Sequence, residues 1–120
     1  MDAPGTADDV RVDLADIPTG EAILVARGGD DEGMHFGLKT QVTTLGRHPE
    51  SDIVLDDITV SRRHSEVRLV DGRYVVSDAG SLNGTYVNQQ RVDTAVLGQG
   101  DELQIGKFRL VFLQSAESLK

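Results

Sequence analysis

The chain has 120 residues, a formal net charge of −8 and 38% apolar residues, a size that suits one domain with a modest core of Val, Leu and Ile. This acidic balance excludes a general binder of nucleic acid, because affinity for phosphate backbones depends on clustered Lys and Arg. The absence of cysteine excludes disulfides and thiolate metal sites.

The first 20 residues contain five acids, one base and few apolar side chains. Such a segment buries too little to offset its ordering entropy, so we expect residues 1–20 to form a flexible tail. It has no signal-peptide pattern, and no apolar run in the chain approaches the roughly 18 residues of a membrane span. We therefore expect a cytoplasmic protein without membrane contact.

From residue 21 onward, short runs rich in Val, Ile, Leu and Thr alternate with clusters of turn residues, a pattern typical of β-strands. We expect a loop at 26–33 and a turn at "HPESD" (48–52). The first expected strands are 21–27, 34–38, 41–47 and 53–55.

Two dipeptides predict β-hairpins. Asp71-Gly72 separates "SEVRLV" from "RYVVSD", and an Asp-Gly pair between two strand runs is typical of a type I′ turn. Gly106-Lys107 separates "DELQI" from "FRLVFL" and predicts a type II′ turn. No window after residue 20 has a helical period, so we expect an all-β sandwich at 21–114, followed by a short tail at 115–120.

An anion site is the best interpretation of the basic residues in the middle of the chain. Six arginines lie between Gly46 and Arg91, and half of them are in two predicted loops, "GRHPESD" and "SRRH". The loops of a sandwich gather at its two ends, so these loops can share a rim. Arginine matches phosphate oxygens with a planar fork of donors, and the Ser61 hydroxyl can add another hydrogen bond. We interpret the remaining arginines as solvated surface charges: Arg63, Arg68, Arg73 and Arg91.

A hydrolase using Ser61 and His64 is a remote alternative. The chain has no Gly-x-Ser-x-Gly elbow, and the adjacent arginines disfavour a protonated catalytic histidine. We interpret His64 as a structural group that connects two loops. The three histidines lack the spacing of metal ligands, so we expect no metal, no cofactor and no catalytic residue.

The Asn83-Gly84 pair has two interpretations, which the spacing favours equally. It can be a plain turn, or a turn whose asparagine amide faces outward and holds the main chain of a ligand, with glycine supplying the left-handed geometry. The Asn-Gly-Thr triplet is formally a glycosylation site, but without a secretory signal the match carries no weight.

The segments "LGRHPESDIVLDDITVSRRHSEVRL", "DAGSLNGTYVN" and "GDELQIGKFRLVFL" together resemble the forkhead-associated (FHA) domain, a phosphothreonine-binding β-sandwich, from Glu21 to Leu113. The resemblance implies about eleven strands, with the peptide-binding loops at one end. It implies roles for a set of residues: phosphate and peptide contacts from Arg47, Ser61, Arg62, Leu82 and Asn83, and loop support from Gly46, His64 and Gly84. Leu82 stands where family members often have a polar residue, which leaves only its backbone amide to contribute.

The same segments look most like the small actinobacterial FHA regulators of 2-oxoglutarate metabolism. In that branch a Ser/Thr protein kinase phosphorylates a Thr-Thr motif in the tail, which then folds onto its own FHA pocket. The unphosphorylated domain inhibits 2-oxoglutarate dehydrogenase and glutamate dehydrogenase. This chain departs from the pattern, since its tail has no Thr-Thr pair and offers only Thr19 and Thr6, of which Thr6 is the candidate phosphorylation site. Either the chain lacks this switch or the switch lies upstream.

We therefore expect a non-catalytic, monomeric phosphothreonine-peptide reader that binds phosphothreonine-containing proteins downstream of Ser/Thr kinases and does not bind nucleic acid. The alternative is a regulatory subunit that docks on a metabolic enzyme through the same loops without phosphate.

Overall fold

Strands form wherever the sequence alternates β-branched or aliphatic residues between turn clusters, and the result is an all-β molecule, as predicted. The computed structural model describes residues 13–29 and 31–115, and these contain eleven strands and one short 3-10 helix. In chain order the elements are η1 (Leu14–Asp16), β1 (Ala22–Ala26), β2 (His35–Gly37), β3 (Val42–Gly46), β4 (Ile53–Val54), β5 (Ser65–Val70), β6 (Arg73–Asp78), β7 (Thr85–Val87), β8 (Gln90–Val92), β9 (Thr94–Val96), β10 (Glu102–Ile105) and β11 (Phe108–Gln114).

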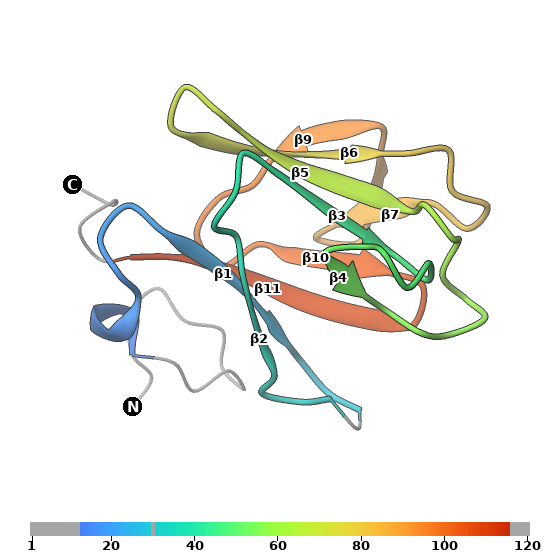
Figure 1. Cartoon of the computed structure of the whole chain (residues 1–120), viewed down its shortest axis with the longest axis horizontal. Coiled ribbons are helices and arrows are strands. Elements are labelled where there is room, and N and C mark those ends of the chain that lie inside the picture. Colours follow the sequence, from blue (N-terminus) through green and yellow to red (C-terminus); the bar gives the residue numbers. More distant parts are fainter. Residues whose placement is uncertain (1–12, 30, 116–120) are drawn as a thin grey trace.

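The strands form two sheets that face each other (Figure 1). One sheet has the order β2-β1-β11-β10-β7-β8, and the other has the order β4-β3-β5-β6-β9. The assigned pairs are antiparallel except for β3 and β4, which run parallel. Both sheets contain neighbours far apart in sequence, such as β1 beside β11, so the sandwich closes only when the two ends of the domain meet.

Both predicted hairpin turns are present. Asp71 and Gly72 have positive φ angles of 51° and 80°, as a type I′ turn requires. Gly106 has φ 58° and Lys107 does not have a positive φ, which fits a type II′ turn. A third tight turn was not predicted: it joins β7 to β8 at Asn88 and Gln89, with φ angles of 50° and 70°. Without a glycine, this turn lacks the usual signal in the sequence.

The core lies between the sheets and consists mainly of Val, Leu and Ile, as the composition indicated. Aromatic packing contributes at one point, where the rings of Tyr74 and Phe112 lie 5.3 Å apart between centroids and are tilted by 56°. Such a tilted pair is a favourable arrangement for aromatic rings in a core. Burial raises the pKa of the Tyr74 hydroxyl, with a smaller contribution from the charge of Glu21.

Part of the segment expected to be tail packs onto the first sheet. Ile17, directly after η1, is 5% exposed and forms a small second cluster with Val25, Val111 and Leu113 on the outer face of β1 and β11. Leu14, three residues earlier, packs against the same cluster, because the short helix places both side chains on one side. Thr6 lies outside the described residues.

The loops that carry the candidate site gather at one end of the sandwich. In Figure 1 the β3–β4, β4–β5 and β6–β7 connections lie at the right, whereas η1 and the end of β11 lie at the left. No helix in the described part of the chain is long and apolar enough to cross a membrane.

Candidate anion-binding site

Arg47 and Ser61 lie side by side, as the anion-site hypothesis requires. The Arg47 backbone N–H donates to the Ser61 carbonyl at 3.0 Å, and the next amide, of His48, donates to the Arg62 carbonyl at 3.2 Å. The Arg47 Nε donates to the Val60 carbonyl at 3.0 Å. The β3–β4 and β4–β5 loops are therefore joined through their backbones. The guanidinium of Arg47 is fixed through Nε, and its Nη groups have no hydrogen-bond partner among the described residues.

Gly46 makes this close approach possible. A Cβ at this position would lie 2.1 Å from the Arg62 carbonyl oxygen and 3.0 Å from its carbonyl carbon. Backbone atoms cannot move away as a flexible side chain can, so only glycine lets the two loops pair. The predicted supporting role of Gly46 has this physical basis.

The hydroxyl of Ser61 keeps its proton for an outside acceptor. Its Oγ accepts a hydrogen bond from the Leu82 backbone N–H at 3.0 Å, and no acceptor for its proton lies among the described residues. The Leu82 amide is thus already used within the protein, and its side chain is 85% exposed. Leu82 contributes by orienting Ser61 across two loops.

Asn83 is anchored through one half of its amide. Its Nδ2 donates to the Thr59 carbonyl at 3.0 Å, whereas no described donor lies within hydrogen-bonding distance of its Oδ1. This arrangement favours the interpretation in which Asn83 offers an acceptor to a ligand over that of a plain turn. Gly84, with φ 91°, supplies the left-handed residue that the turn needs.

His64 is fully buried and uses both ring nitrogens within the protein. Nδ1 accepts from the Ser61 backbone N–H at 3.0 Å, so the neutral ring carries its proton on Nε2, which donates to the Gly84 carbonyl at 2.8 Å. The ring therefore connects the Ser61 loop to the Asn83 loop. Neither nitrogen bonds the Ser61 hydroxyl, so the pair lacks the contact that a nucleophile and its base need.

The carboxylate of Asp78 stabilises the β6–β7 loop by accepting hydrogen bonds from it. Its two carboxylate oxygens accept from the backbone N–H groups of Gly80 and Ser81 and from the hydroxyls of Ser81 and Thr85. Burial of the carboxyl opposes its ionisation, but these donors together outweigh burial and lower the pKa of Asp78. The Thr85 proton goes to Asp78, so Ser65, 2.6 Å away, must be the donor to Thr85.

The sequence did not predict a role for Thr59. This residue connects the rim, formed by the β3–β4, β4–β5 and β6–β7 loops, to the β10–β11 hairpin. Besides accepting from Asn83, Thr59 accepts from the Lys107 backbone N–H through Oγ1 at 2.9 Å. The same hydroxyl donates to Asp57 at 2.5 Å, and this bond is the main cause of the lowered pKa of Asp57. An Asp-x-Thr triplet is a signal for such a local turn. The β10–β11 hairpin is attached to the rim in this way.

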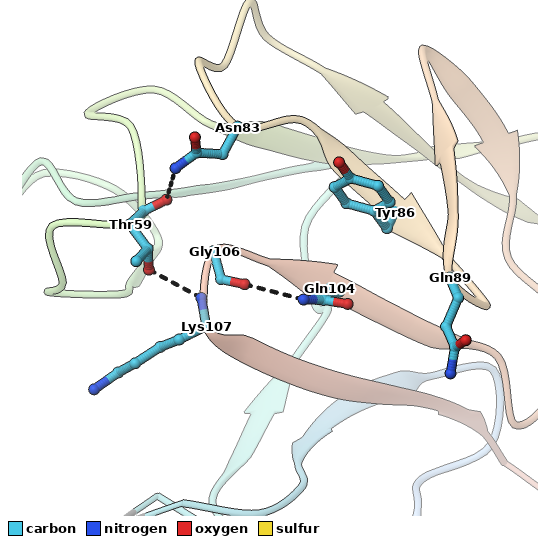
Figure 2. A pocket seen from close by; sticks show the side chains of 7 residues that line it. All are labelled: Thr59, Asn83, Tyr86, Gln89, Gln104, Gly106 and Lys107. Carbon is cyan, nitrogen blue, oxygen red and sulfur yellow. Dashed lines mark hydrogen bonds between the residues drawn. The ribbon is translucent and has the colours of Figure 1, made fainter.

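A cavity of about 560 Å³ adjoins Asn83 on the outer side of the first sheet (Figure 2). Six polar side chains and Gly106 line it: Thr59, Asn83, Tyr86, Gln89, Gln104, Lys107. Thr59 and Asn83 belong to the loops of the candidate site, so the cavity directly adjoins these loops.

The rim is basic on an acidic protein. Arg47, Arg62 and Arg63 are exposed, and within the described residues none of them lies within salt-bridge distance of a carboxylate. In the same part of the chain no three His, Asp or Glu side chains lie close enough together to hold a metal ion. The available groups are therefore guanidinium donors, a hydroxyl proton and an amide acceptor, a set suited to a phosphorylated peptide.

Comparisons with known proteins agree with this geometry. The FHA domain family model matches residues 43–106. The chain is 53% identical over 120 residues to the glycogen accumulation regulator GarA of Mycolicibacterium smegmatis, covering 98% of this chain and 76% of that protein. It is 59% identical over 97 residues to the oxoglutarate dehydrogenase inhibitor of Corynebacterium efficiens, covering 81% of this chain and 68% of that protein. Among solved structures, Mycobacterium tuberculosis EmbR in complex with a low affinity phosphopeptide aligns with a TM-score of 0.75 and 32% identity, over 80% of this chain and 25% of that one.

Proposed function

Because the chain belongs to the FHA family, we propose that its loop rim binds phosphothreonine peptides and that the protein is a non-catalytic signalling regulator. The observation that carries this proposal is the backbone pairing of Arg47 with Ser61, which places the Nη groups of Arg47 beside a hydroxyl proton that no described acceptor binds. A phosphate monoester is a doubly charged acceptor that fits both donors at once.

The available donors are sufficient for a useful affinity. A hydrogen bond to a charged group contributes about 1.5–3 kcal/mol net, so Arg47, Ser61 and Arg62 together can supply about 4.5–9 kcal/mol. A micromolar complex needs about 8 kcal/mol. The loops are already tied together in the free protein, which reduces the entropy lost on binding.

In this proposal each residue has one task. Arg47, Ser61 and Arg62 hold the phosphate, and Asn83 accepts a hydrogen bond from the peptide main chain. Leu82 holds the Ser61 hydroxyl in place. The remaining positions keep the loops in register: Gly46, His64 and Gly84.

We further propose that the protein acts in the cytoplasm downstream of a Ser/Thr protein kinase and regulates a metabolic enzyme. The name of the relative called oxoglutarate dehydrogenase inhibitor supports 2-oxoglutarate dehydrogenase as a partner. Glutamate dehydrogenase is a second candidate, which only the family resemblance in the sequence implies. Thr6 remains the candidate phosphorylation site of this chain. We propose residues 21–114 as the ligand-binding domain, flanked by the segments 1–20 and 115–120.

Replacing either phosphate donor tests the proposal directly. We expect Arg47→Ala and Ser61→Ala each to weaken binding of a phosphothreonine peptide by more than about ten-fold, because each removes a hydrogen bond to a charged group. Titration calorimetry measures the affinities, and the unphosphorylated peptide provides the baseline. Arg73→Ala removes the same charge at the far end of the β5–β6 hairpin and should leave affinity unchanged. Wild-type affinity in both site variants would refute the assignment.

A second function, docking without phosphate, is favoured by two exposed apolar side chains beside the rim. Ile58 is 89% exposed and Leu82 is 85% exposed, and each stands next to a residue of the Thr59–Asn83 hydrogen bond. Because that hydrogen bond brings the two side chains into one region, they form an exposed apolar area of the kind that marks protein interaction sites. A pull-down from cytosol before and after phosphatase treatment separates the two functions, because a pure phosphopeptide reader loses its partners when phosphate is removed.

A further inference from the structure

Arg91 belongs to the rim, although the sequence suggested only a solvated charge. It lies on β8, and its side chain runs across Gly84: a Cβ on Gly84 would lie 2.8 Å from the Arg91 Nε and 3.0 Å from its Cζ. Gly84 directly follows Asn83 in the turn. The guanidinium of Arg91 is therefore packed beside the residue proposed to hold the peptide main chain.

The strand register places Arg91 directly across from Tyr86, a residue that lines the cavity. Arg91 is the cross-strand partner of Tyr86, and Tyr86 is in turn the partner of Gln104. Directly opposed residues in antiparallel strands project from the same face of the sheet. Because Tyr86 and Gln104 line the cavity, Arg91 stands on the same outer face of the sheet, on the edge strand β8.

Arg91 also differs from Lys107 in having no ion-pair partner among the described residues. Lys107 lines the cavity, but its ammonium lies 3.4 Å from Asp57 and 5.4 Å from the centre of the Phe108 ring. Figure 2 shows the Lys107 side chain pointing away from Tyr86 and Gln89. Among the described residues, no carboxylate lies within salt-bridge distance of Arg91 and no acceptor binds its guanidinium.

The other flank of the rim has the opposite character. Arg63 lines a separate cavity, of about 340 Å³, together with Glu50 and Glu66. An acidic ligand side chain entering there meets two carboxylates. The cavity on the Asn83 flank has no carboxylate among its lining residues, and Arg91 projects from the same face of the sheet as Tyr86 and Gln104.

We propose that Arg91 is a specificity residue, which binds the carboxylate of an Asp or Glu that flanks the phosphothreonine on the Asn83 side. This inference rests on the phosphothreonine-binding function proposed above. The guanidinium offers a planar pair of donors that fits a carboxylate bidentately. Its packing against Gly84 restricts the side chain before the ligand arrives, so less rotamer entropy is lost on binding.

The test is a set of phosphothreonine peptides that carry Glu or Gln at each flanking position in turn, measured against wild type and Arg91→Ala. For wild type we expect a preference for Glu over Gln of about two- to five-fold at one or two positions on one side, as for an exposed ion pair. Arg91→Ala should lose this preference and bind the Gln peptides as wild type does. Because rim charges act through long-range attraction, the preference should also shrink at high salt.

Charge reversal gives a second, independent readout. Arg91→Glu should prefer Lys to Glu at the same peptide position, while Arg73→Ala, the matched loss of a distant arginine, should keep the wild-type preference. Equal weakening of the Glu and Gln peptides by Arg91→Ala, or a Glu preference that survives it, would overturn the inference and leave the phosphate site intact. Loss of the difference between phosphorylated and unphosphorylated peptides in wild type would instead overturn the proposed function itself.

Discussion

Each side chain proposed to face the ligand uses one polar atom in a hydrogen bond within the protein and presents another to a ligand. Arg47 binds the Val60 carbonyl through Nε and leaves its Nη groups free, and Ser61 accepts from Leu82 while keeping its own proton. Asn83 donates to Thr59 through Nδ2 and leaves Oδ1 as an acceptor. The inner bonds fix the rotamers, so the outer groups need little reordering to meet a phosphopeptide.

Gly46 is the residue on which this arrangement depends most directly. We expect Gly46→Ala to lower the free energy of unfolding by about 1–3 kcal/mol, the usual cost of overpacking, because its Cβ overlaps the Arg62 carbonyl. Phosphopeptide affinity should fall as well, since the backbone bonds that place Arg47 beside Ser61 must lengthen. Urea denaturation and calorimetry measure the two effects.

Gly37 provides the matched control for that substitution. It lies in β2, without a positive φ, and a Cβ there meets only the flexible side chain of Lys39, at 3.2 Å or more. Gly37→Ala should therefore be neutral or slightly stabilising. If Gly46→Ala behaved in the same way, the contact with Arg62 would have no role in holding the loops.

At the scale of elements, the β6–β7 loop is a hydrogen-bonded unit built around one carboxylate. Asp78 accepts four hydrogen bonds, and Ser81, one of its donors, also accepts from the Gly84 N–H at 2.9 Å. This chain of bonds runs from β6 through the loop to β7. The position of Asn83 is thus set by a residue that does not touch the ligand.

The ionisation of Asp78 makes this loop sensitive to acid. The pKa of Asp78 is lowered because its donors outweigh the burial that opposes ionisation. A carboxyl with a folded-state pKa below its unfolded value of about 3.9 contributes full stability above that pH and loses it as pH falls through the folded pKa. We expect Asp78→Asn to cost about 1–3 kcal/mol at pH 7 and to flatten the fall in stability below about pH 4. Urea denaturation between pH 2.5 and 7, roughly the range of this titration, measures both.

Asp56 is a suitable control, because it is exposed and no hydrogen bond to its side chain is formed within the described residues. Asp56→Asn should leave the free energy of unfolding at pH 7 close to the wild-type value. An Asp78→Asn variant with the wild-type slope in acid would show that the loop does not depend on the charge of Asp78.

The fold was predictable from sequence where its signals are local. Asp71-Gly72 requires two left-handed residues and so specified the β5–β6 hairpin, and the alternating apolar runs specified most of the strands. The strands β8 and β9 were not predicted, because each has only three residues, too few to show an alternating pattern. The FHA family assignment was confirmed, since it depended on the order of whole motifs and not on single elements.

The sequence pointed to candidate ligand-facing groups and to three loop supports, Gly46, His64 and Gly84, but not to every residue that joins the loops. The role of Thr59 was not predicted because this residue acts partly through its backbone carbonyl, which every residue possesses. Arg91 was assigned to the solvated surface because its position depends on the pairing of β8 with β7, and that register cannot be read from the local sequence. Positions fixed by long-range backbone contacts thus lie beyond sequence patterns.

On the scale of the whole molecule, charge is distributed unevenly. The chain has a net charge of −8, yet exposed arginines without carboxylate partners among the described residues surround the proposed site. A basic rim on an acidic body attracts a phosphopeptide locally while the body repels polyanions such as nucleic acids. The overall charge therefore supports selectivity for a small, doubly charged group.

The molecule is also stabilised at the end opposite the site by a segment that the sequence assigned to a tail. Ile17 packs on Val25 and Val111, and the Gly20 N–H donates to the Ser115 hydroxyl at 3.2 Å. Comparing a chain of residues 13–120 with one of residues 21–120 isolates this contribution. We expect the shorter chain to be less stable by about 1.5–3 kcal/mol, the value for burying one large aliphatic side chain. Ile17→Ala in the longer chain should reproduce most of that loss, with phosphopeptide affinity unchanged because the rim lies at the other end. Equal unfolding free energies for the two chains would mean that the folded unit begins at residue 21 and that the packing of Ile17 adds nothing to its stability.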